Sequence, residues 1–152
     1  MTPASPSADD ISLEAIHRIR DECLCLASQR AARVLARRFD RLFAPLGLTN
    51  GQFSMLVAIS GSWKPRLGEL AEFLAMDQAT MTAAAKTLER RGFLALAADE
   101  TDARARRPVL TEAGRVAVAA AVPQWQQEHQ KVQAELAGTD TVALARILSQ
   151  LG

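Results

Sequence analysis

Residues 66–111 constrain the fold more strongly than any other part of the 152-residue chain. Two short amphipathic segments meet at Met76 and Asp77, and an apolar run, a charged loop and a second short run follow them. Asp77 is well suited to begin the second helix, because its carboxylate can accept hydrogen bonds from the free amides of the first turn. Gly92 stands where glycine commonly ends a helix. The order predicts helix, tight turn, helix and β-hairpin, which together make a winged helix-turn-helix.

The polar side chains of this stretch are of the kinds that contact nucleic acid. A winged helix-turn-helix places its second helix in the major groove, where Gln, Thr and Lys can reach base edges or phosphates. Arginines on a loop tip can reach a minor groove or the backbone. A solvated charge run on a small helical domain is the alternative, and it accounts for any one of these residues alone. The ordered set favours double-stranded DNA as the partner, with candidate contacts at Gln78, Thr80, Thr82, Lys86, Arg90, Arg104, Arg106 and Arg107.

Four stretches occur in an order that is typical of one family. They are LTNGQFSMLVAI (48–59), LGELAEFLAMDQATMT (67–82), LERRGFL (88–94) and DARARRPVLTEAG (102–114). On these pieces the chain, from about Leu24 onward, resembles the MarR-type transcriptional regulators. The resemblance implies a homodimer that binds a palindromic operator and is released by a small aromatic or phenolic ligand. A repressor is expected, and an activator would have the same sequence features.

One position of the recognition helix departs from the family pattern. Many relatives have an arginine directly after the second threonine of this helix, where this chain has Ala83. Gln78, Thr82 and Lys86 share one face at spacings of four residues. These three side chains are therefore expected to carry more of the base readout, while Thr80 lies on a phosphate or in the helix cap.

The charged loop carries the family's Asp-x-Arg element at Asp102 and Arg104. A carboxylate can hold an arginine by charge-assisted hydrogen bonds, so Asp102 is expected to support the wing. Arg104 is expected at the wing tip, in a narrow minor groove where the negative potential is strongest. Arg106 and Arg107 are expected either to contact the DNA backbone or to support the wing.

The N-terminal part of the chain is expected to contribute to dimerisation. Residues 1–10 are rich in proline, serine and small residues and predict a flexible lead. An apolar stripe at helical spacing predicts one long helix over residues 11–45. The dimerisation helix is therefore assigned to residues 11–47, with Gly47 at its end.

The remainder of the chain divides into the DNA-binding domain at 48–111 and C-terminal dimerisation helices at 112–152. Thr49 and Gln52 predict a capping box at the start of the first helix of the DNA-binding domain. Pro123 lies inside an otherwise helical pattern and predicts a kink or a break. The expected class is mainly α with a small β-hairpin wing.

Two kinds of signal are candidates for controlling such a regulator. A ligand pocket is expected between the first helix, the helix of Phe53 and the Pro123 segment, with candidate residues Arg33, Phe39, Phe53 and Trp63. For each arginine of the first helix alone, a solvated charge is the more common interpretation, and a tryptophan at position 63 is more often a packing residue than a ligand contact. The alternative is redox sensing at Cys25, near the place where some MarR relatives sense peroxide. The chain has no tyrosine, the residue that helps those thiols to ionise, so the ligand hypothesis is favoured.

Composition excludes several other classes. The formal net charge is +1, so the basic character is local. No stretch is long and apolar enough for a membrane span and no leader opens the chain, which favours the cytoplasm. His17 and His129 lack metal-ligand spacing with the two cysteines, and no glycine-rich phosphate loop occurs. No enzyme, metal or cofactor is therefore expected, and an interaction module that does not bind DNA is the alternative from another class.

Overall fold

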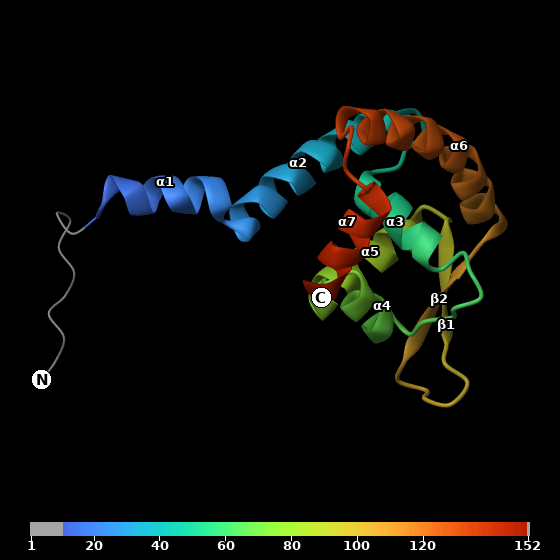
Figure 1. Ribbon diagram of the computed structural model, residues 1–152. Coiled ribbons are helices and arrows are strands. Elements are labelled where there is room, and N and C mark those ends of the chain that lie inside the picture. Colours follow the sequence, from blue (N-terminus) through green and yellow to red (C-terminus); the bar gives the residue numbers. More distant parts are fainter. Residues whose placement is uncertain (1–10, 152) are drawn as a thin grey trace, which may run out of the picture. The chain divides into compact units, whose positions relative to one another are not determined.

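The computed structural model describes residues 11–151, and its elements follow the expected order (Figure 1). They are α1 (Leu13–Glu22), α2 (Leu24–Phe43), η2 (Ala44–Leu46), α3 (Asn50–Ala58), α4 (Leu67–Phe73), α5 (Gln78–Arg90), β1 (Leu94–Ala98), β2 (Arg106–Leu110), α6 (Glu112–Glu135), α7 (Thr141–Leu148) and η3 (Ser149–Leu151). The mainly helical class with one antiparallel hairpin is confirmed for the described residues. The lead predicted at residues 1–10 lies outside them. The chain divides into two units, residues 1–37 and 38–152, which we describe separately.

In the N-terminal unit, the single helix predicted for residues 11–45 is wrong at Cys23. This residue has an extended backbone, with φ −71° and ψ 108°, so α1 ends before it and α2 begins after it. The Cys23 thiol accepts a hydrogen bond from the amide of Leu26 at 3.5 Å, so it caps the first turn of α2. The apolar periodicity continues across this point without proline or glycine, and the break therefore leaves no sequence signal.

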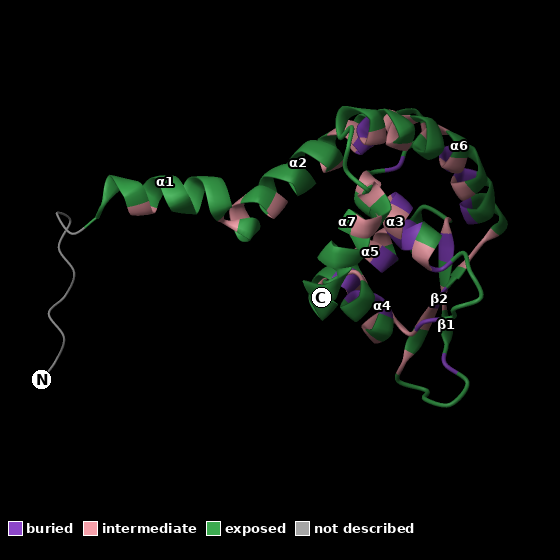
Figure 2. Ribbon diagram, viewed as in Figure 1, coloured by how far each residue is buried: buried purple, intermediate pink, exposed green. Residues whose placement is uncertain are grey.

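The core of the C-terminal unit packs α3, α4, α5 and β1 against the end of α2 and the first half of α6. Phe43 and Phe53 meet with ring centroids 4.4 Å apart. Figure 2 shows the buried positions gathered in these elements. The buried core side chains are Phe39, Phe43, Leu48, Phe53, Met55, Leu56, Ile59, Leu70, Ala71, Met81, Leu88, Leu94, Ala117 and Ala121.

The helix ends of the DNA-binding domain follow the local signals of the sequence. Thr49 and Gln52 form the predicted capping box at the start of α3. The Asp77 carboxylate accepts the amide of Thr80 at 2.8 Å and so caps α5. Gly92 has φ +76°, a left-handed conformation that glycine adopts without strain. These three predictions are confirmed. They could be made from the sequence because each depends only on residues that are close in the chain.

The hairpin leads directly into α6. Leu94 pairs with Leu110 and Ala98 with Arg106, so the two strands join the end of α5 to the start of α6. Gly114, in the first turn of α6, is buried, and an added Cβ would lie 2.0 Å from the carbonyl oxygen of Phe93. Only glycine therefore allows α6 to approach the hairpin this closely.

Helix α6 continues through Pro123 and curves along its length (Figure 1). Of the predicted kink or break, the break does not occur, and the helix bends along its length instead (Figure 1). Pro123 and Ala119 are exposed, so water can satisfy the carbonyl whose hydrogen bond the proline removes. Within the described part of the chain, no helix is long and apolar enough to cross a membrane.

Candidate nucleic-acid interface

The recognition helix α5 presents one polar face to solvent. Gln78 and Lys86 are exposed and Thr82 is half-buried, and the three line one open depression with Ala79 and Ala83. The Thr82 hydroxyl donates to the carbonyl of Gln78 at 2.8 Å, which leaves its oxygen free to accept. The helical spacing thus places the three predicted readout residues together. That they contact bases stays a prediction.

The two ends of α5 hold the other candidates of this helix. The Thr80 hydroxyl donates to the second carboxylate oxygen of Asp77 at 2.5 Å, so Thr80 belongs to the cap. Hydrogen bonds from the Thr80 side chain and backbone lower the pKa of Asp77 below its ordinary value. Arg90 is exposed in the last turn, where its guanidinium donates to Thr87 at 3.2 Å.

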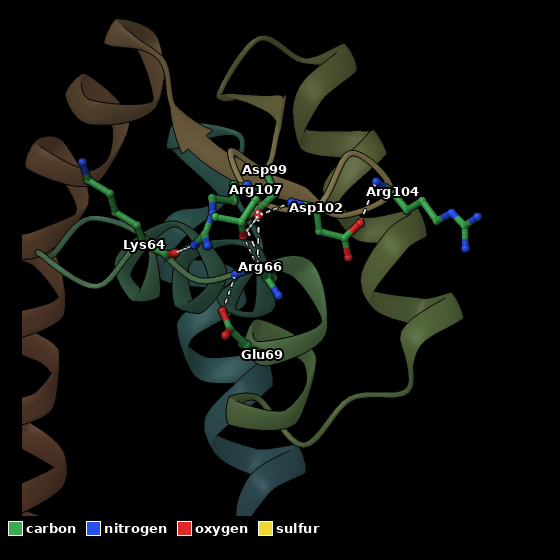
Figure 3. Close-up of polar contacts among 8 residues, drawn as sticks. Lys64, Arg66, Glu69, Asp99, Asp102, Arg104 and Arg107 are labelled. Atoms are coloured by element: carbon green, nitrogen blue, oxygen red, sulfur yellow. Dashed lines mark hydrogen bonds and ion pairs between the residues drawn. The ribbon is translucent and has the colours of Figure 1, made fainter.

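The wing tip carries Arg104 on an ordered turn. Its amide donates to the Asp102 carboxylate at 2.9 Å, and the Asp102 carbonyl accepts the amide of Ala105 at 3.0 Å. Figure 3 shows the Arg104 side chain extending away from the hairpin. Asp102 therefore shapes the turn through its backbone neighbours, and the prediction that it binds an arginine side chain is wrong. Arg106 is exposed at the start of β2.

At the base of the wing, the carboxylate that binds arginine side chains is Asp99, the only buried charged residue in the described part of the chain. Arg66 donates to it through Nε at 3.1 Å and Nη2 at 3.0 Å, and Arg107 donates through Nε (Figure 3). The amides of Thr101 and Asp102 donate to the same carboxylate at 3.0 and 2.9 Å. The Arg66 guanidinium and then the Thr101 hydroxyl hold the pKa of Asp99 well below its usual range.

This cluster joins the wing to the start of the helix-turn-helix. Arg66 precedes α4, and its amide donates to the Glu69 carboxylate at 2.6 Å. Arg107 also donates to the carbonyl of Lys64, in the segment before α4. Arg107, a candidate for DNA contact, is therefore engaged as a wing support, the other role expected for it.

Sequence reasoning missed Asp99 and Arg66. Asp99 directly follows the apolar strand β1, and a carboxylate at a buried strand end requires a charged partner. That was an available signal, but Arg66 lies 33 positions earlier, and no spacing rule connects the two.

The four candidate pocket residues do not line one common pocket. Arg33 is exposed in the N-terminal unit, whereas Phe39 and Phe53 are 7% exposed in the core of the other unit. Trp63 is 42% exposed and meets Phe73 edge-on with ring centroids 5.2 Å apart. It lines a cavity of about 540 Å3, to which none of the other three contributes.

Comparison with known proteins identifies the family. The MarR family model matches residues 48–105, which span α3 to the wing tip. The transcriptional regulator MosR of M. tuberculosis, solved in complex with DNA, is 37% identical, with 86% of this chain and 96% of MosR covered and a TM-score of 0.76. The chain belongs to the MarR family. It is therefore a DNA-binding transcriptional regulator, and regulators of this family are not enzymes.

Two further relatives bear on regulation. The transcriptional repressor CouR, solved on a 23-mer DNA duplex, is 28% identical, with 88% of this chain and 94% of CouR covered and a TM-score of 0.74. CouR has also been solved with p-coumaroyl-CoA. The transcriptional activatory protein BadR of Rhodopseudomonas palustris is 29% identical over 115 residues. That alignment covers 74% of this regulator and 63% of BadR, so the chain spans less than two thirds of this relative.

Proposed function

We propose that this MarR-family regulator is a homodimeric repressor that binds a palindromic operator and is released by a small aromatic ligand. The observation that carries the proposal is the pairing of two exposed polar features in one compact unit. These are the polar face of α5 and the basic wing tip at Arg104. The Asp99 cluster supports a defined spacing between them, because it joins the base of the wing to the start of α4.

The proposed readout follows from the side chains on each feature. Gln78 is suited to adenine and Lys86 to guanine in the major groove, whereas Ala83 contributes no polar contact. Arg104 enters the adjacent minor groove, where its charge adds affinity more than sequence choice. Arg90 and Arg106, both exposed, contact phosphates.

Dimerisation is supported by apolar side chains that a monomer would leave in water. On α1, where no residue is buried, Leu13 is 72% and Ile19 is 63% exposed. On α7, which also has no buried residue, Ile147 is 59% exposed. Contiguous exposed apolar faces of this kind commonly mark protein interfaces. A two-fold dimer presents two recognition helices, which explains a palindromic operator.

Release by a ligand and repression are proposed by analogy to CouR, which is named a repressor and has been solved with DNA and with an aromatic thioester. BadR is named an activatory protein, so the direction of control needs its own measurement. In vitro transcription from the promoter beside the gene is expected to fall when the regulator is added. A rise in transcript would refute repression and leave DNA binding intact.

The experiment for the DNA-binding proposal is a gel shift with the intergenic DNA beside the gene, combined with light scattering. We expect a dimer in solution and retention of that DNA in preference to a scrambled duplex of equal length. A monomer, or equal affinity for both duplexes, would overturn the proposal and support an interaction module instead.

Oxidation of Cys25 is the second candidate signal. The Cys25 thiol is exposed, and the Gln29 amide donates to its sulfur at 3.1 Å. Arg33 donates to the Gln29 oxygen at 3.0 Å, so a positive charge lies behind that donor. The exposed thiol is open to oxidants, and the peroxide comparison with Cys25→Ser tests it.

A further inference from the structure

The pairing of the two wing strands leaves one backbone amide of β1 facing away from its partner strand. The amide of Asp99 donates to the carbonyl of Ala105 at 3.2 Å, so this pair is hydrogen-bonded. Along an antiparallel ladder, hydrogen-bonded pairs alternate with pairs that are not hydrogen-bonded. In the observed register, Leu96 is opposite Pro108 in a pair of the second kind. The Leu96 amide therefore points away from β2, and Pro108, which has no amide proton, costs the ladder no bond.

Glu89 of α5 accepts this amide. Its Oε1 atom lies 2.9 Å from the Leu96 nitrogen, so the recognition helix is bonded directly to the wing. Glu89 forms no ion pair with any residue between 11 and 151. Without Glu89, the amide would be one of the unpaired donors that the edge of a sheet presents to water.

A carboxylate at this position of α5 is otherwise unfavourable. Glu89 is exposed in the last turn of the helix, where the helix dipole disfavours a negative charge. It follows Lys86 by three positions, so it lies about one helical turn from a residue that the proposed function places on DNA. The phosphates of bound DNA repel a nearby carboxylate. Both effects count against an acid, and the contact with Leu96 is what accounts for its presence.

The wing is therefore attached to the rest of its unit at two points along β1. Asp99, which directly follows the strand, binds Arg66 in front of α4. Leu96, three residues earlier and so roughly 10 Å along the strand, is bound by α5. One point of attachment leaves the hairpin free to turn about it, whereas two points separated along the strand fix its direction.

We propose that Glu89 is a positioning residue that fixes the direction of the wing relative to the recognition helix. Arg104 at the wing tip and the polar face of α5 then reach the operator together. The inference rests on the proposed function, because it takes Arg104 and Lys86 as DNA contacts. Glu89 itself contacts no DNA. Its effect on operator affinity passes through the wing, so it must depend on the presence of Arg104.

Two substitutions separate the hydrogen bond from the charge. Glu89→Gln and Glu89→Met remove the same negative charge and keep a side chain of similar length, but only glutamine keeps an oxygen that accepts the Leu96 amide. Affinity is measured by titration of a labelled operator duplex. We expect Glu89→Gln to bind at least as tightly as wild type, and Glu89→Met to bind about three- to tenfold more weakly than Glu89→Gln. Equal affinity of the two variants would overturn the inference.

The same pair of variants on an Arg104→Ala background shows whether the effect passes through the wing tip. The wing contact is already lost there, so the ratio of affinities between Glu89→Gln and Glu89→Met should approach one. A ratio as large as in the presence of Arg104 would make Glu89 a general support of the domain and overturn the inference. Glu72→Gln and Glu72→Met, at an exposed acid on α4, are the matched controls and should bind alike.

Deuterium exchange of the Leu96 amide, followed by NMR, tests the contact without DNA. This amide should exchange at least severalfold faster in Glu89→Met than in Glu89→Gln, while the amide of Met55 in the buried part of α3 exchanges equally in both. An equal rate for Leu96 would overturn the inference whatever the result with DNA. Wild-type protein that binds no operator specifically would instead count against the proposed function, and the exchange of Leu96 would still decide whether Glu89 holds the wing.

Discussion

Replacing Asp99 with asparagine removes the charge from the residue that joins the wing to the start of α4, with little change in side-chain size. One carboxylate oxygen accepts from Arg66 Nη2, from the amide and hydroxyl of Thr101, and from the amide of Asp102. The other accepts from Arg66 Nε and Arg107 Nε. An asparagine can keep its oxygen at the first position, but its amide nitrogen then faces the two guanidinium donors.

The expected loss of stability follows from the hydrogen bonds that Asp99→Asn removes. Two charge-assisted hydrogen bonds disappear at a buried site, and two positive groups lose their counter-charge. For a chain of this length we expect the melting temperature to fall by about 5–10 °C. Because the wing is then less firmly held, operator affinity should fall up to about tenfold, the size of one lost DNA contact.

The assay compares wild type, Asp99→Asn and Glu72→Gln by thermal melting and by operator titration. Glu72 is an exposed acid on α4, so its replacement makes the same change of charge without a buried partner. The control should melt and bind like wild type. If Asp99→Asn also matched wild type in both measurements, the Asp99 carboxylate would not be responsible for fixing the wing to the start of α4.

The pH dependence of the melting temperature gives an independent check on the role of Asp99. The folded-state pKa of Asp99 lies below its unfolded value, so its contribution is fully present above the ordinary carboxyl range and is lost as the pH falls. The difference in melting temperature between wild type and Asp99→Asn should stay constant between about pH 7 and 5 and narrow below about pH 4. A difference that grew on acidification would refute the assigned sign.

Three other substitutions test the DNA contacts and the signal. Arg104→Ala should weaken operator binding by ~1–3 kcal/mol and reduce the salt slope by about one, and unchanged binding at several salt concentrations would contradict a groove contact. Gln78→Ala should relax preference at one base pair per half-site by roughly 1–3 kcal/mol, whereas an unchanged consensus from a binding-site selection would count against it. Cys25→Ser should keep DNA binding and release by the physiological ligand. Peroxide that frees wild type but not Cys25→Ser would make the thiol the sensor.

The DNA-binding module could be predicted closely because its boundaries depend on neighbouring residues. Asp77 caps α5 through the amide three positions on, and Gly92 ends it by adopting a left-handed conformation. The spacing of Gln78, Thr82 and Lys86 places them on one face of any helix. These features require no knowledge of distant parts of the chain.

One helical prediction failed and another was met only in part, because both outcomes depended on more than apolar periodicity. The break at Cys23 lies within a stripe that reads as continuous helix. Pro123, by contrast, is tolerated within α6, because its side of the helix is exposed and the freed carbonyl can meet water. Neither solvent access nor a thiol cap can be read from the spacing of apolar residues.

The roles of individual side chains were decided by tertiary packing. Phe39, Phe53 and Trp63 are all aromatic residues, but folding buries the first two in the core and leaves the third beside a cavity. Asp102 has the family spacing, yet Asp99 is the carboxylate that the fold buries between Arg66 and Arg107. A buried charge must find a partner wherever the fold supplies one, and Arg66 lies 33 positions away. Local sequence therefore specifies the recognition helix and the wing, whereas only the folded chain brings together the charges that hold the wing against the start of α4.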